Sequence, residues 1–345
     1  MDLDDLLDAV EDGDVKAVAA GLDKHNIDIN GVDDEGFTPL MLASHCGEEA
    51  IVQLLLERKA NCDFTAGDGS DALMCAVQGG HEHIVQDLLD AKAEVNQTME
   101  DGFSPLYSAA QEGHTRIVRK LIKAKAAVDG MCMGVTPLFI AAQENHLGCV
   151  QALVSASCNI NAPNPSGASP LFIAVQKGNT PIVKSLIKRK KKELDYEMCT
   201  KQGLTALLVA IKIGHLDEAM LLIENGANID TPAEADGMTP LMTAALYGDI
   251  DLVEELVEAG ADVNAHNDDG DDAAAILMRE YGEDFNSIIA AHQQTKAPAK
   301  PSKAPPPPPS KGKSKKKKKH KKAPPPPGKV SSIFIVFGDC SWHIT

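Results

Sequence analysis

An all-α solenoid, in which short helix pairs stack on one another, is the fold that the 345-residue sequence predicts. A unit of about 33 residues recurs along most of the chain, with leading glycines at positions 36, 69, 102, 134, 167, 203, 237 and 270. Each unit also carries the apolar spacing of two short helices. Because no single unit could bury its apolar face alone, the units must stack.

Each unit is predicted to open with a β-hairpin loop and a first helix. Pairs such as Asp68-Gly69 and Asp101-Gly102 place glycine where a tight turn needs a positive φ. A Thr-Pro or Ser-Pro pair follows in most units, as in Thr136-Pro137. The hydroxyl can cap free helix amides, and proline fits the first turn. In most units the helix then ends at a glycine eleven residues after the first.

The second helix of each unit is predicted from pairs of apolar residues four positions apart. Ile84, Val85, Leu88 and Leu89 are one example, and they define a single buried face. Small alanines on the first helix and branched aliphatic side chains on the second favour close stacking of neighbouring units.

The repeats are expected to form one array over residues 1–292, with units that start near 3, 36, 69, 102, 134, 167, 203, 237 and 270. The first unit has an acidic outer face and the last lacks Thr-Pro-Leu, so both are predicted to be terminal caps. Residues 293–329 are predicted to be a disordered Lys/Pro-rich tail. Residues 330–345 form a short apolar segment, either an aggregation-prone run or a wrongly predicted chain end.

Several short motifs together carry a family resemblance. They are Thr-Pro-Leu, paired alanines, Gly-His, Ile-Val-x-x-Leu-Leu, and the Gly-Ala-Asp-Val-Asn run at 260–264. The chain resembles ankyrin repeats over roughly residues 3–292. One position departs from the family pattern, because apolar or aromatic residues replace the usual histidine after Thr-Pro-Leu. They are Met41, Met74, Tyr107, Phe139, Phe172, Leu208 and Met242.

Charge divides the chain into an acidic array and a basic tail. Residues 1–295 contain 49 Asp and Glu against 20 Lys and Arg, a net −29, and residues 296–345 contain 13 Lys against one Asp, a net +12. Attraction between the two parts, or between the array and basic partners, follows at low salt. Autoinhibition by the tail is therefore one hypothesis, and its deletion should then raise partner affinity.

The tail contains two motifs of the form Pro-x-x-Pro-x-Lys, made by Pro306, Pro309 and Lys311, and by Pro324, Pro327 and Lys329. They resemble ligands of SH3-type or WW-type domains, and a plain spacer is the equal alternative. A lysine cluster lies between them at Lys315, Lys316, Lys317, Lys318, Lys319, Lys321 and Lys322. It fits a nuclear import signal, a phosphate-binding patch or a solvated charge run.

The absence of certain sequence motifs leads to expectations about cellular location and catalytic chemistry. Without a basic and apolar leader or an apolar run of membrane-spanning length, we expect an intracellular, cytoplasmic chain with no membrane span, and the lysine cluster leaves nuclear import open. No cofactor, metal or catalytic residue is expected. The pair His81 and His83 lies at i and i+2, which is the wrong spacing for one helix face, so a structural role for His81 is favoured.

The resemblance implies that a protein partner binds the hairpin tips and the exposed side of the first helices, which together form the concave face. Carried onto this sequence, the partner-binding candidates are Phe37, His45, Gln78, Phe103, Gln111, Glu112, Gln143, Glu144, Gln176, Lys177, Lys212, Met238, Leu246 and Tyr247. The four glutamines form a ladder of amides that can donate and accept along an extended peptide. The apolar members could anchor an interface. The competing interpretation is repeat duplication without function, with aromatic residues packed on adjacent hairpins.

A non-catalytic scaffold or adaptor, monomeric and bound to another protein, is the function predicted from these observations. The alternative is a nuclear or nucleic-acid-associated regulator that uses the lysine cluster. We do not expect nucleic acid to bind the array, because the array is strongly acidic. Binding of the isolated tail to duplex nucleic acid over a salt series separates the two functions.

Overall fold

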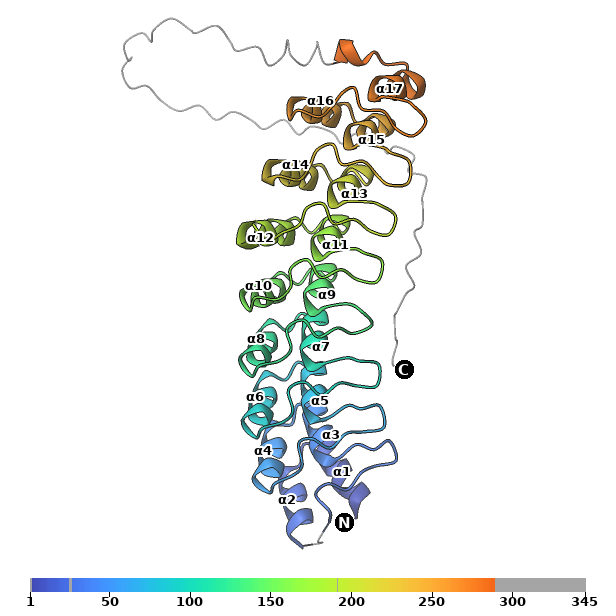
Figure 1. Cartoon of the computed structure of the whole chain (residues 1–345). Coiled ribbons are helices and arrows are strands. Elements are labelled where there is room, and N and C mark those ends of the chain that lie inside the picture. The colour runs from blue at the N-terminus through green and yellow to red at the C-terminus, as the bar shows by residue number, and fades with distance from the viewer. Residues whose placement is uncertain (1, 25–26, 191, 289–345) are drawn as a thin grey trace, which may run out of the picture. The chain divides into compact units, whose positions relative to one another are not determined.

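The computed structural model describes residues 2–24, 27–190 and 192–288, and this part of the chain consists of helices, turns and loops. The predicted all-α solenoid is confirmed. Figure 1 shows the odd-numbered helices in one row, the even-numbered helices in a second row, and long loops projecting beside the odd-numbered row. The tail motifs, the lysine cluster and the segment 330–345 lie outside the described residues.

We call the odd-numbered helices inner and the even-numbered helices outer. The inner helices are α1 (Leu3–Glu11), α3 (Pro39–Cys46), α5 (Ala72–Gln78), α7 (Pro105–Gln111), α9 (Pro137–Gln143), α11 (Pro170–Gln176), α13 (Ala206–Lys212), α15 (Pro240–Tyr247) and α17 (Ala273–Tyr281). The outer helices are α2 (Val15–Lys24), α4 (Glu49–Glu57), α6 (Glu82–Asp90), α8 (Thr115–Lys123), α10 (Leu147–Ser155), α12 (Thr180–Lys190), α14 (Leu216–Asn225) and α16 (Ile250–Glu258).

The inner helices begin where the Thr-Pro and Ser-Pro pairs predict. Thr136 accepts a hydrogen bond from the backbone nitrogen of Phe139 at 3.2 Å, and proline occupies the first turn. The same cap recurs in most units, and Asp71 provides it for α5, at 2.7 Å from the nitrogen of Met74. Each cap satisfies one of the free amides and is worth about 1 kcal/mol.

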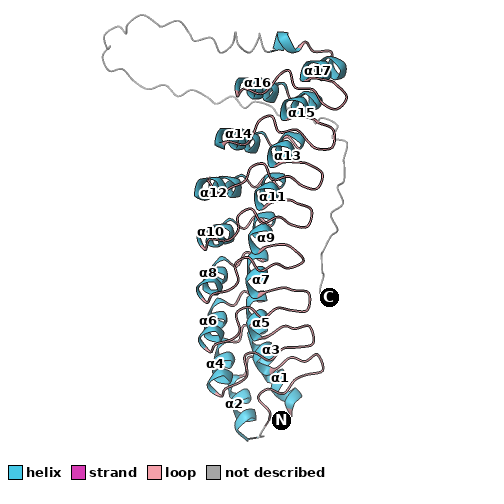
Figure 2. Ribbon diagram, in the orientation of Figure 1, coloured by secondary structure: helices cyan, strands magenta, loops and turns pink. Residues whose placement is uncertain are grey.

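The predicted hairpin loops are present, but they form no strands among the described residues (Figure 2). In the loop before α3, the nitrogen of Asp33 donates to the carbonyl of Phe37 at 3.1 Å, and Gly36 has φ +90°. The carboxylate of Asp33 accepts from the nitrogens of Glu35 and Phe37, at 2.9 and 2.8 Å. Because side chains satisfy the loop amides, too few backbone pairs remain to make a β-ladder.

A ladder of side-chain to backbone hydrogen bonds joins the loops that follow the outer helices. Asn30 accepts from the nitrogen of Asn61, and Asp63 accepts from that of Glu94, at 2.8 and 2.9 Å. Equivalent bonds continue to the link between Asp230 and Asp262 at 2.8 Å. Each unit is therefore tied to the next at the same point.

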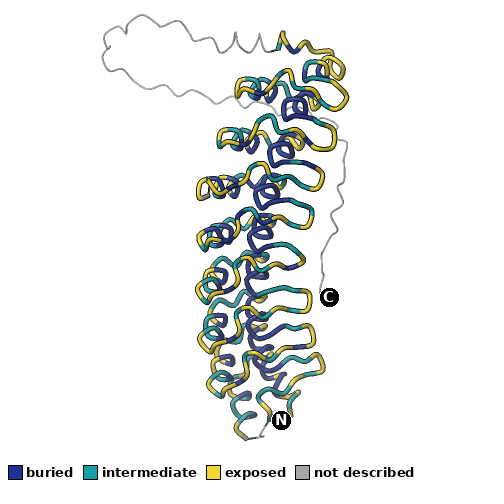
Figure 3. The backbone as a smooth tube through the Cα atoms, viewed as in Figure 1, coloured by how far each residue is buried: buried dark blue, intermediate teal, exposed yellow. Residues whose placement is uncertain are grey.

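Small residues let the inner helices approach closely. Successive inner helices contact one another from α1 to α17, and successive outer helices do so from α2 to α14. Ala43, Ala76, Ala109 and Ala174 are fully buried between them. In Figure 3 the buried residues follow the inner helices, whereas exposed residues mark the loop tips and the outer helices. The residues that replace the usual histidine after Thr-Pro-Leu are also buried.

Glu218 stands where other units place isoleucine or valine, and it is 4 % exposed. The hydroxyl of Thr180 at the start of α12 donates a short hydrogen bond to its carboxylate. Thr115 and Cys149 are placed in the same way between α8 and α10, with 3.5 Å between oxygen and sulfur. The buried carboxylate therefore joins two outer helices.

Candidate interaction surface

The ends of the inner helices form a regular row of side chains. Gln78, Gln111, Gln143 and Gln176 are the last residues of α5, α7, α9 and α11. Gln78 is exposed and the other three are half-buried. The residues that follow three of them, Glu112, Glu144 and Lys177, are exposed. His45, Lys212, Leu246 and Tyr247 lie at the ends of α3, α13 and α15 and are exposed.

Side chains of the next unit hold the backbone of these helix ends. Nε2 of His81 donates to the carbonyl of His45 at 2.9 Å, and Nε2 of His146 donates to the carbonyl of Gln111 at 2.8 Å. In later units Asn179, His215 and Tyr281 reach the carbonyls of Ala142, Val175 and Leu246, each at 2.9 Å. The expected architectural role of His81 is therefore confirmed.

Glycines make room for these side chains. A Cβ added to Gly113 would lie 2.5 Å from Nδ1 of His146, and the residue has φ +77°. Tyr281 covers Gly248 in the same way, although it comes from the end of α17 rather than the start of an outer helix. The ends of the inner helices are consequently fixed relative to one another by packing as well as by hydrogen bonds.

The glutamine amides differ in what they contact. Gln143 donates to the carboxylate of Glu144 at 2.9 Å, and Gln78 lies 3.8 Å from the sulfur of Met99. The side chains of Gln111 and Gln176 make no hydrogen bond within the described ranges. Their amides can therefore donate to and accept from a bound backbone without losing an internal bond.

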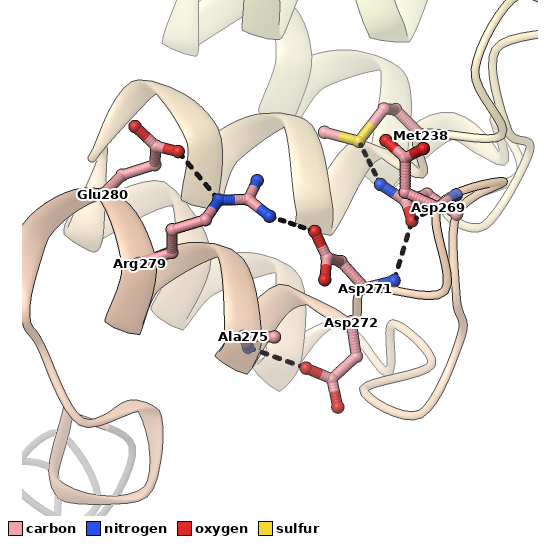
Figure 4. A network of polar contacts seen from close by, with 8 residues as sticks. Met238, Asp269, Asp271, Asp272, Ala275, Arg279 and Glu280 are labelled. Carbon is pink, nitrogen blue, oxygen red and sulfur yellow. Dashed lines mark hydrogen bonds and ion pairs between the residues drawn. The ribbon is translucent and has the colours of Figure 1, made fainter.

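The residues predicted to be apolar anchors differ in how far they are exposed. Phe37 and Phe103 are half-buried against the core, and the ring of Phe103 lies edge-on to Tyr107 with centroids 5.3 Å apart. The expectation that Met238 is exposed is wrong, because Met238 is 8 % exposed and its sulfur accepts a hydrogen bond from the Asn267 amide at 3.4 Å (Figure 4). Leu246 and Tyr247 are exposed by 39 % and 48 %.

Two exposed methionines on the loop before α9 were not predicted as site residues. Met131 and Met133 are 55 % and 65 % exposed. Between them, Cys132 exchanges two backbone hydrogen bonds with Val135, at 3.0 and 2.8 Å, so this loop is a two-residue hairpin. The step of 32 residues from Gly102 to Gly134 is the sign of this shorter loop in the sequence.

The surface therefore changes along the array. Over α5 to α11 it presents amides and charges, and over α13 and α15 it presents Ile213, Leu246 and Tyr247, each at least 39 % exposed. We call the helix ends and hairpin tips together the inner face.

Three matches to one family model identify the family of this chain. A model of ankyrin repeats matches residues 6–99, 73–164 and 171–267. The chain belongs to the ankyrin-repeat family. Ankyrin repeats typically act as non-catalytic protein-interaction modules.

A curated relative is similar to a small part of this chain. A segment of 59 residues is 41 % identical to a BTB/POZ domain-containing protein 3 of Schizosaccharomyces pombe (strain 972 / ATCC 24843). The similarity covers 17 % of this chain and 11 % of the fission yeast protein. The chain therefore matches only about a tenth of the length of that protein, and the likeness does not extend to the rest of it.

The described ankyrin units contain buried thiols, but no metal-binding cluster and no membrane-spanning helix. In these units no group of three or more His, Cys, Asp or Glu is arranged to hold a metal. Cys75, Cys132 and Cys149 are buried thiols outside any disulfide, and burial raises the pKa of the Cys75 thiol to about 12. No helix within the described ranges is both long and apolar enough to cross a membrane.

Proposed function

We propose that this ankyrin array is a scaffold or adaptor that binds an extended segment of another protein on its inner face. The observation that carries the proposal is the row of helix ends, in which the ends of α3, α7, α9, α11 and α15 are tied to a following unit by a side-chain hydrogen bond at 2.8 to 2.9 Å. A surface that is already ordered loses little conformational entropy on binding.

The chemistry of the inner face favours a partner with two parts. The amides of Gln111 and Gln176 suit the backbone of an extended peptide. Ile213, Leu246 and Tyr247 suit an apolar side chain at one end of that peptide, because exposed aromatic and aliphatic residues commonly anchor interfaces. The proline motifs at 306–311 and 324–329 add a second docking segment for an SH3-type or WW-type domain.

The test changes the polar row and keeps the fold. We suggest the triple variant Gln111→Arg, Glu112→Lys and Gln143→Arg, which places cations where the partner's backbone would lie. A charge-matched triple variant on the outer helices, Gln53→Arg, Glu57→Lys and Glu224→Gln, changes exposed residues away from this face. Both full-length variants and the wild type are used in affinity capture followed by quantitative mass spectrometry.

We expect the inner-face variant to lose a set of partners that the wild type and the outer-helix variant both retain. If all three proteins capture the same partners in the same amounts, the inner face is not the binding surface. Replacement of Pro306 and Pro309 by alanine tests the second docking segment separately, because it leaves the array unchanged.

A further inference from the structure

The charge of the array divides into three parts along the chain. Residues 1–112 hold 25 Asp and Glu against 5 Lys and Arg, which is a net −20. Residues 113–192 hold 2 against 12, a net +10, and residues 193–288 hold 22 against 3, a net −19. The acidic array therefore contains a basic centre, which its total charge conceals.

Most of the basic centre lies on two outer helices that flank a neutral one. α10 contacts α8 on one side and α12 on the other. Arg119 and Lys123 of α8, and Lys184 and Lys188 of α12, are all exposed. α10 itself, Leu147–Ser155, contains neither lysine nor arginine. Two rows of cations therefore border a helix without charge.

A shallow cavity of about 270 Å³ lies over α10. Its lining combines neutral side chains of α10 and its end with one arginine from each neighbouring helix. The lining residues are Gln151, Ala152, Ser155 and Ala156, Arg119 and Ile122 of α8, and Arg189 of α12. Nη1 of Arg189 donates to the Ser155 hydroxyl at 2.8 Å, so this guanidinium is held over the cavity. We call this feature the outer groove.

Exposed cations on the two helices that flank the outer groove lack acidic partners among the described residues. On the far side of α8, Arg116 and Lys120 pair with Glu82 of α6, at 3.4 and 3.6 Å. In the described part of the chain, no carboxylate forms an ion pair with Arg119, Lys123, Lys184 or Lys188. Their positive charge is therefore directed to solvent, where an anion can compete with water for it.

We propose that the outer groove binds a short Asp/Glu-rich segment of a partner protein. Arginine suits carboxylates because its planar guanidinium donates two parallel hydrogen bonds. Neighbouring helices lie about 10 Å apart, so the basic centre spans only a short peptide. A duplex or a membrane would extend over the flanking parts, whose charges of −20 and −19 repel polyanions. This site lies on the outer helices and is separate from the inner face.

The experiment measures binding of a short fluorescent Asp/Glu-rich peptide to the full chain by anisotropy at low salt. The groove variant carries Arg119→Gln, Lys123→Gln, Lys184→Gln and Lys188→Gln. Its matched control carries Lys16→Gln, Lys59→Gln, Lys92→Gln and Lys201→Gln, which removes the same charge from exposed positions elsewhere. A third variant replaces the tail lysines 315–319, 321 and 322 by glutamine, because these also attract the peptide.

We expect the groove variant to bind the peptide about tenfold more weakly, since four exposed ion pairs of about 0.3 kcal/mol or more are lost. The charge-matched control should change affinity by less than about twofold. Ser155→Trp, which fills the groove at an exposed position without changing its charge, should also weaken binding. A neutral inner-face variant, Gln111→Ala with Gln176→Ala, should bind the peptide like the wild type.

Three results would overturn the proposal. They are an equal loss in the groove variant and its matched control, a loss only in the tail variant, and tighter binding of duplex DNA or phosphatidylserine vesicles at the groove than of the peptide. Circular dichroism of each variant establishes that a loss of binding is not a loss of fold.

Discussion

At the scale of single residues, the pairing of His146 with Gly113 shows how two units are joined. The imidazole lies on the glycine and donates to the carbonyl of Gln111 at 2.8 Å. Gly214 occupies the equivalent place in a later unit with φ +74°, but no atom lies within 4 Å of an added Cβ. Both glycines therefore have a left-handed backbone conformation, but only Gly113 is covered by a side chain of the next unit.

This difference gives a matched test. Gly214→Ala should lower the free energy of unfolding by about 1 kcal/mol, which is the cost of a left-handed alanine. Gly113→Ala should cost about 1 to 3 kcal/mol more, because it also displaces His146 and leaves a carbonyl without its donor. Urea denaturation of both variants measures the difference. Equal losses would mean that the histidine contributes nothing to stability.

Burial couples the ionisation of Asp71 to the stability of the fold. It caps α5 through one carboxylate oxygen, and the other oxygen is buried without a partner. Burial, reinforced by the nearby charge of Asp63, raises the pKa of Asp71 from 3.8 to about 6. The folded state therefore holds this proton at pH values where the unfolded state has lost it.

The sign of the pH dependence follows from this raised pKa. The contribution of Asp71 to stability is full below pH 3.8 and is lost as the pH rises through about 6. Asp71→Thr restores the cap used by other units and has no charge to bury. At pH 7.5 it should raise the free energy of unfolding by about 1 to 3 kcal/mol, and the gain should vanish below pH 4. A gain that does not vary with pH would show that ionisation of Asp71 is not its cause.

At the scale of elements, the hairpin before α9 departs from the other loops. Both central residues of its two-residue turn have positive φ, at +49° for Met133 and +78° for Gly134. Turns of this kind prefer Asn or Gly at the first of these positions, so the exposed methionine is strained.

Met133→Asn should relieve this strain and raise the melting temperature, with a gain of about 1 kcal/mol in the free energy of unfolding. Met131→Asn is the control, because Met131 is also exposed but has no positive φ. Thermal denaturation followed by circular dichroism measures both variants. If Met133 contacts the partner, the same substitution lowers partner affinity while it stabilises the protein. No gain in stability over the control would show that the turn tolerates methionine without strain.

At the scale of the whole array, stability depends on contacts between neighbouring units. Leu153 in α10 and Leu256 in α16 occupy equivalent places, and both are fully buried. Each Leu→Ala substitution should cost about 2 to 5 kcal/mol locally. Their effects on cooperativity should differ, because Leu153 lies between two long runs of units and Leu256 lies near the last unit.

We expect Leu153→Ala to separate the unfolding of the units before and after α10, and Leu256→Ala to increase opening only in the last units. Hydrogen exchange measured by mass spectrometry resolves the two patterns along the chain. A uniform increase of exchange over all units in both variants would mean that the array unfolds as one cooperative body.

Most of the fold could be predicted from the sequence because each repeat contains short-range signals that set where its helices begin and end. Thr136-Pro137 starts a helix, Gly113 ends one, and both effects act within a few residues. The repeat of the pattern then identifies the family and the inner face, on which Gln111 and Tyr247 lie as expected.

What the sequence could not supply is the set of contacts between residues far apart in the chain. The burial of Met238 depends on Asn267 in the following loop, and the role of Tyr281 depends on its reach back to Gly248. The outer groove likewise exists only because stacking brings Arg119 and Arg189 to the two sides of α10. Helix propensity and apolar periodicity depend on residues that are close together in the sequence. The contacts described here depend on how whole units pack, so only the tertiary structure shows them.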